Sequence, residues 1–78
     1  MIASVRRKGR QYILILGEDS GLKPGDIVLA SIGVVRIRRR VSIDRRLKRL
    51  VIYLPIACNP IWEEMVDKDI QVTIQKAN

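Results

Sequence analysis

The stretch Val34-Val35-Arg36-Ile37-Arg38-Arg39-Arg40-Val41-Ser42-Ile43 decides the fold class of this chain. Apolar residues at positions 35, 37, 41 and 43 share one face of the stretch, and the opposite face carries Arg36, Arg38, Arg40 and Ser42. A period of two is typical of a β-strand that buries one face. Arg39 interrupts this period, so we expect either a bulge at Arg39 or an inward Arg39 held in an ion pair. The pattern predicts a strand over residues 34–43.

Other stretches rich in β-branched residues predict further strands at residues 13–16, 27–32, 50–54 and 70–74, with Gly or Pro near several of their ends. A first strand precedes Arg10. The stretch at 70–74 has the clearest alternation, because Ile70, Val72 and Ile74 are separated by polar residues. The chain is therefore predicted to be mainly β.

One short helix is predicted over residues 60–66. Asn59 suits the N-cap and Pro60 suits the first helical position. Ile61, Trp62, Met65 and Val66 recur at helical spacing, and such a stripe usually packs on a core. We therefore interpret Trp62 as a structural anchor. The connection at residues 17–25 is rich in turn formers and has room for at most one helical turn.

The cations are concentrated in two segments. The chain has 15 Lys and Arg against 8 Asp and Glu, a formal net charge of +7. The first segment contains Asp44 as its only acid and the cations Arg36, Arg38, Arg39, Arg40, Arg45, Arg46, Lys48 and Arg49. The second segment contains Arg6, Arg7, Lys8 and Arg10. Such patterning is expected of a surface that faces a polyanion.

Residue content argues against an enzyme. The chain has no His and a single Cys, Cys58, so it can form neither a His-based triad nor a Cys/His zinc site. Adjacent acids at 18–19 and 63–64 diverge on a turn or helix, and no Gly-rich phosphate loop is present. We expect no catalysis, no cofactor and no metal, with Cys58 acting as a small buried apolar residue.

Length and hydropathy predict one small basic domain over residues 1–78. No apolar run approaches the ~20 residues needed to span a bilayer, so we expect a cytoplasmic protein without a membrane partner. The many Arg, Ile and Val residues favour a thermophilic source.

The two halves of the chain resemble each other. Each half reads as two strands, a connection or helix, and a third strand. Asp26 precedes Ile27-Val28-Leu29 as Asp69 precedes Ile70-Gln71-Val72. A single ββ-α-β unit would leave an open apolar sheet, whereas two units can close one barrel without edges. The sequence therefore predicts a small six-stranded barrel built from a duplicated ββ-α-β unit.

Two segments carry a resemblance to a known family. Lys8-Gly9-Arg10 with Ile13-Leu14-Ile15 and then Gly21-Leu22-Lys23-Pro24-Gly25-Asp26-Ile27-Val28 resembles the AbrB/SpoVT swapped-hairpin proteins and related cradle-loop barrels with a Gly-Asp box. The segments Val51-Ile52-Tyr53-Leu54-Pro55 and Asp69-Ile70-Gln71-Val72 are similar to the same unit. The resemblance implies a small barrel and DNA binding. Swapped-hairpin proteins dimerise with one unit per chain, so two units in one chain favour a monomer over a homodimer. Taken on its own residues, Pro24-Gly25-Asp26 is a structural turn in which Asp26 accepts backbone N–H bonds.

These observations predict a protein that binds nucleic acid through a long hairpin over residues 34–54, with Asp44-Arg45-Arg46 near its tip. The expected contacts are Arg36, Arg38, Arg40, Arg45, Arg46, Lys48 and Arg49, with Arg6, Arg7, Lys8 and Arg10 as a secondary patch. Tyr12, Tyr53 and Trp62 are too few to stack single-stranded bases, so contact with the backbone of a duplex is favoured.

Three alternatives stay open. Structured or ribosomal RNA is close behind DNA, because small size and high pI suit both. The chain could also serve as an accessory subunit docked on a larger machine such as a polymerase. The third alternative assigns the Arg residues to surface ion-pair networks of a thermophilic protein.

Overall fold

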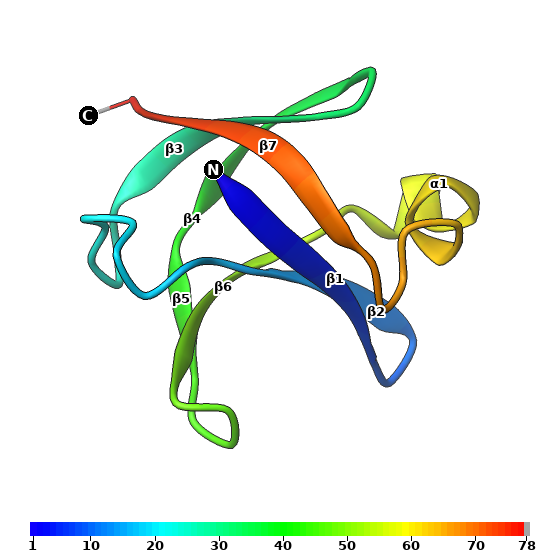
Figure 1. Cartoon of the computed structure of the whole chain (residues 1–78), viewed down its shortest axis with the longest axis horizontal. Helices are drawn as coiled ribbons and strands as arrows, with labels where there is room; N and C mark the ends of the chain where they lie inside the picture. Colours follow the sequence, from blue (N-terminus) through cyan, green and yellow to red (C-terminus); the bar gives the residue numbers. More distant parts are fainter. Residues whose placement is uncertain (78) are drawn as a thin grey trace.

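A computed structural model describes residues 1–77 and shows a mainly β chain with one short helix, as predicted (Figure 1). The strands are β1 (Ile2–Lys8), β2 (Gln11–Ile15), β3 (Ile27–Ile32), β4 (Val35–Arg40), β5 (Ser42–Asp44), β6 (Arg49–Tyr53) and β7 (Asp69–Lys76). A 3-10 turn, η1 (Ile56–Cys58), and a helix, α1 (Asn59–Glu63), lie between β6 and β7. The seven strands form one unclosed antiparallel sheet in the order β4-β3-β7-β1-β2-β6-β5.

The strand predicted over residues 34–43 is divided at Val41, so the sheet has seven strands instead of six. Val41 N–H donates to the Asp26 carbonyl and the Val41 carbonyl accepts from Gly25 N–H, both at 2.8 Å. Beyond Val41 the chain changes partner, from β3 to β6. The predicted hairpin over residues 34–54 is therefore shorter than expected: β5 and β6 form it with the predicted tip after Asp44, but residues 35–40 pair with β3. Alternation identifies a strand and its buried face, but it does not identify the neighbouring strand.

The division at Val41 also shapes the sheet. β4 and β5 lie at opposite ends of the strand order, yet Val41 alone separates them in the chain. One residue spans only about 3.4 Å. The sheet must therefore curl until its two edges approach each other at Val41, and Figure 1 shows β4 running directly into β5.

The inner face of the curled sheet forms the main core. Its largest fully buried side chains are Val5, Leu14, Leu16, Val28, Ile32, Val41, Ile52, Leu54, Trp62 and Val72. Trp62 is 0% exposed, and its indole N–H donates to the Pro55 carbonyl at 2.9 Å. The prediction that Trp62 is a structural anchor is confirmed. Cys58 is free and half-buried, and it packs against this core.

The helix is shorter than predicted and begins differently. It spans Asn59–Glu63 instead of residues 60–66, and Cys58 occupies the N-cap position predicted for Asn59. The Asn59 side-chain amide instead donates to the Arg10 carbonyl at 3.3 Å. This bond ties the helix to the β1–β2 turn. No helix within residues 1–77 is long and apolar enough to cross a bilayer.

A second, smaller core lies on the outer face of β2 and β6. It contains Ile13, Ile15 and Val51, with Leu47 and Tyr53 packed against them. Leu47 belongs to the turn after β5, so this turn folds over the outside of the sheet. Ile43 pairs in register with Leu50, which packs against the main core, so it keeps the face of Val41 as the alternation predicted, although it is 51% exposed there. Its neighbour Asp44 is buried.

The Gly25-Asp26 turn has the structural role expected from the sequence. Gly25 has φ of 95°, a conformation that side chains with a Cβ resist. The Asp26 carboxylate accepts the Lys23 N–H at 2.9 Å, and the Asp26 N–H donates to the Lys23 carbonyl at 3.1 Å. The turn starts β3 and also holds Val41.

Candidate nucleic-acid interface

The structure distributes the predicted cations over two surfaces instead of one hairpin. Arg36, Arg38 and Arg40 lie on β4, which pairs with β3. The cations at positions 45, 46 and 48 lie in the turn after β5, near the β1–β2 hairpin that carries the N-terminal cluster. The two surfaces therefore have to be considered separately.

Arg36, Arg38 and Arg40, here called the β4 row, occupy alternate positions of one regular strand. Alternate residues of a strand point to the same face, so the three guanidiniums share one face at spacings of about 6.8 Å. All three side chains are exposed. The row presents three positive charges in a line, on the outer face of the sheet.

Two rows of paired residues run from the β4 row across β3 and β7. In register, Ser31 lies between Arg36 and Thr73, and Leu29 lies between Arg38 and Gln75. A shallow groove of about 540 Å³ covers this face and is lined by Leu29, Ala30, Ser31, Arg36, Ile37, Arg38, Thr73 and Gln75. The groove combines guanidinium, hydroxyl, amide and apolar groups.

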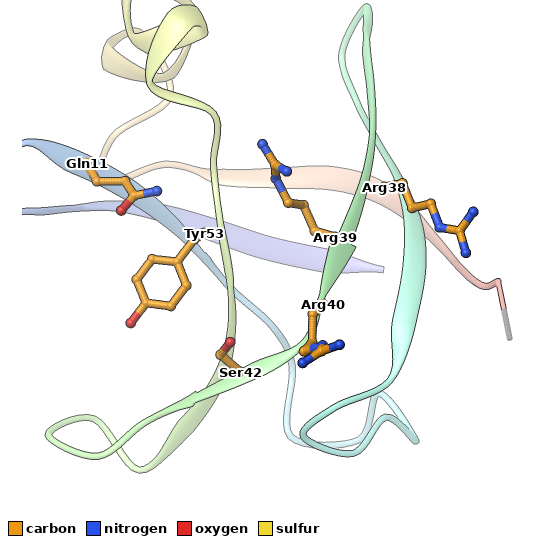
Figure 2. A pocket seen from close by; sticks show the side chains of 6 residues that line it. All are labelled: Gln11, Arg38, Arg39, Arg40, Ser42 and Tyr53. Atoms are coloured by element: carbon orange, nitrogen blue, oxygen red, sulfur yellow. The ribbon is translucent and has the colours of Figure 1, made fainter.

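Arg39 is the residue that broke the sequence pattern, and it lies on the opposite face of β4 from Arg38 (Figure 2). The β3–β4 register passes through the pair Val28 and Arg39 without a bulge. Within residues 1–77 Arg39 forms no ion pair, and its side chain is exposed. The expected bulge is therefore wrong, and Arg39 has the predicted inner face, that of its strand partner Val28, without the expected ion pair within residues 1–77. Arg39 instead lines an open cleft of about 490 Å³, together with Gln11, Arg38, Arg40, Ser42 and Tyr53.

The second surface, here called the turn surface, contains Arg6, Lys8, Arg45, Arg46 and Lys48. Arg6 pairs in register with Ile13, whose side chain belongs to the outer core that Leu47 covers. The Asp44 carboxylate caps the turn by accepting the backbone N–H groups of Arg46 and Leu47, both at 3.0 Å. Packing of Leu47 and capping by Asp44 thus hold the turn over the outer face.

The ammonium group of Lys8 has close partners that shift its pKa. Its Nζ lies 2.6 Å from Asp44 Oδ2, 3.4 Å from the Tyr53 hydroxyl and 5.7 Å from the centre of the Tyr53 ring. The hydrogen bond with Asp44, and then that with Tyr53, raise the pKa of Lys8. The hydrogen bond from Lys8 and then those from the turn lower the pKa of Asp44. Lys8 therefore forms a structural ion pair, and its predicted contact with phosphate stays a prediction.

Arg49 also has a structural partner. Its Nη2 donates to the Leu16 carbonyl at 2.7 Å, and the residue is half-buried. This bond fixes the start of β6 against the end of β2, and the predicted phosphate contact of Arg49 stays a prediction. Arg7 donates from Nε to the Gly9 carbonyl at 3.0 Å within its own turn. Arg10 is exposed at the same turn.

Ion pairs are few in the described part of the chain. The two within residues 1–77 are Lys8 with Asp44 and Lys76 with Asp26, the latter at 3.6 Å. Neither pair involves the β4 row. This count is lower than a surface ion-pair network would require, so the Arg residues of β4 need another explanation.

Acid is expected to destabilise the protein through Asp44. The pKa of Asp44 in the folded protein lies below its ordinary 3.8, so its contribution to stability is complete above that value and is lost as the pH falls through the folded pKa. The pKa of Lys8 lies above its ordinary 10.5, so its contribution is lost only as the pH rises through that higher value.

Melting temperatures of the wild type and of Asp44→Asn, measured from about pH 7 to about pH 2, test this prediction. The substitution removes the charge but keeps a side-chain oxygen that can cap the turn. The variant should melt below the wild type at neutral pH and lose less stability in acid. Equal acid sensitivity of the two proteins would contradict the role given to Asp44.

Sequence reasoning missed the partners of the β4 row. Leu29, Ser31, Thr73 and Gln75 join it only through the pairing of β3 with both β4 and β7. The alternation at residues 70–74 already placed Thr73 on an exposed face of its strand, but nothing in the sequence placed that face beside the arginines.

No protein-family model, no curated protein and no solved structure matches the chain.

Proposed function

We propose that this protein is a non-enzymatic binder of duplex DNA that contacts the phosphate backbone through the β4 row. The observation that carries the proposal is that Arg36, Arg38 and Arg40 share one exposed face and form no ion pair with any described acid. Arg binds phosphate through charge-assisted hydrogen bonds and releases counterions from the duplex. A line of guanidiniums on a rigid strand suits a regularly spaced backbone.

A second explanation of the β4 row is protection of a sheet edge. Charged side chains on an edge strand hinder edge-to-edge aggregation. That role requires charge but no accompanying groove, whereas the β4 row borders a groove with hydroxyl and amide groups. The combination favours a bound polyanion, and DNA binding by the variants described in the Discussion separates the two roles.

The turn surface serves in the proposal as a secondary patch. Arg6, Arg45, Arg46 and Lys48 are not buried and form no ion pair within residues 1–77. Their positive field adds to the attraction of a polyanion even where they make no direct contact. Lys8 and Arg49 also support this surface structurally.

Binding of a blunt duplex by the isolated wild-type protein at several salt concentrations tests the proposal. With on the order of 4 to 6 phosphates neutralised, log affinity should fall against log salt with a slope of about −0.9 per contact. Fluorescence anisotropy of a labelled duplex gives this slope. Tighter binding to a structured RNA would favour the RNA alternative, and binding to neither would favour an accessory subunit that needs a partner.

We further infer that the sheet is a six-stranded barrel of two ββ-α-β units, in which β4 and β5 together count as one strand. In the strand pairing, β1 of the first half corresponds to the β4–β5 stretch of the second half, β2 to β6 and β3 to β7. β1 pairs with β2 and β7, and the β4–β5 stretch likewise pairs with β6 and β3. The remaining two pairs, β2–β6 and β3–β7, each join corresponding strands of the two units. This symmetry supports a duplication and a relation to the cradle-loop barrels. Both units lie in one chain, so sedimentation should give a folded monomer, and an obligate dimer would contradict the proposal.

A further inference from the structure

We infer that Leu29 and Gln75 read an A·T base pair in the major groove of the DNA held by the β4 row. This inference rests on the proposed function and adds sequence preference to it. Leu29 and Gln75 lie directly opposite each other on β3 and β7, and Arg38 is the partner of Leu29 on the other side. One row across the sheet thus carries a cation, an apolar group and an amide.

The chemistry of the row matches that of an A·T pair. In the major groove adenine presents an acceptor, N7, beside a donor, N6, and a glutamine amide can bind both. Thymine presents its methyl group on the same edge, where an apolar side chain can contact it. Leu29 is 48% exposed although it is large and apolar, and it lies in the groove beside guanidinium, hydroxyl and amide groups.

The spacing also suits the major groove. Neighbouring strands lie about 4.8 Å apart, so Gln75 and Leu29 are close enough to contact a single base pair. The β4 row lies on the next strand, where its guanidiniums can hold the backbone that borders the groove. The major groove of B-form DNA admits a two-stranded β-ribbon, whereas that of A-form RNA is too narrow for side chains to read. The inference therefore specifies DNA.

The first test is selection of tight binders from a duplex pool with a randomised centre, using wild-type protein. Selected duplexes should share at least one A·T pair at a fixed position. Replacing that thymine by deoxyuridine removes only the methyl group and should weaken binding of the wild type, but should not weaken binding of Leu29→Ala further.

Gln75→Ala is the second test. It should reduce the preference for the selected duplex over a scrambled one by about tenfold, with unchanged affinity for the scrambled duplex and an unchanged salt slope. Gln71→Ala is the matched control, because Gln71 lies on the same face of β7 but pairs with Ile2, outside the groove. This control should keep the preference.

The outcomes separate the inference from the proposed function. Binding without any enriched sequence, or an equal loss of preference in both Gln variants, overturns base reading and leaves backbone binding in place. Failure to bind any duplex overturns both.

Discussion

Replacing Arg36, Arg38 and Arg40 together with Gln is expected to weaken binding to a duplex about 100-fold at ~0.15 M salt. Counterion release contributes about 1 kcal/mol per phosphate contact at this salt concentration, and three contacts are lost. The slope of log affinity against log salt should become shallower by about 2.7. Gln keeps a polar side chain on the strand, so the variant should stay folded, which its melting temperature checks. Anisotropy titrations over a range of salt give both quantities.

The matched comparison removes the same charge from the turn surface, with Arg6, Arg45 and Arg46 replaced by Gln. This variant should lose less affinity than the β4 variant, because its cations act mainly through their long-range field. Equal losses in the two variants would show that binding follows net charge and would overturn the role of the β4 row. Aggregation of the β4 variant with undiminished DNA affinity would assign the row to edge protection.

Trp62→Ala is expected to destabilise the protein by roughly 3 to 5 kcal/mol. The large indole is fully buried, so truncation loses its transfer free energy and leaves a cavity. It also leaves the Pro55 carbonyl without its hydrogen bond from the indole. For a chain of 78 residues this is a large part of the usual stability. Denaturant unfolding of the purified variant measures the loss.

Ile56→Ala is the control for the helix region. Ile56 is 60% exposed on η1, and its truncation should change the free energy of unfolding by no more than about 0.5 kcal/mol. The folded fraction of Trp62→Ala should still bind DNA with nearly normal affinity, because the β4 row lies on other strands. A stable Trp62→Ala protein would contradict the burial on which this prediction depends.

The strands were predictable from their content of β-branched residues and, at residues 34–43 and 70–74, from alternation, whereas their partners were not. Residues 27–32 match β3 at both ends. The stretch at 34–43 read as one strand because its alternation hides the change of partner at Val41. That change depends on the turn at Gly25, which supplies the backbone groups that bond Val41. Such a contact is distant in sequence and leaves no periodic signal.

The candidate site was predictable in composition but not in arrangement. The density of Arg residues indicated a polyanion surface, but the long hairpin was the wrong scaffold for it. Lys8 and Arg49 were counted as free cations because the sequence cannot show that they contact Asp44 and the Leu16 carbonyl. Only the pairing of β7 with β3 brings Gln75 into the groove.

Titration of isotope-labelled protein with a short duplex, followed by amide chemical shifts in NMR spectra, tests directly whether the β4 row binds the DNA backbone. We expect changes concentrated on β3, β4 and β7, at residues whose side chains line the groove beside the β4 row. Smaller changes are expected at the turn after β5. Changes confined to that turn and to the β1–β2 hairpin, or none at saturating DNA, would contradict the claim that the β4 row binds the backbone.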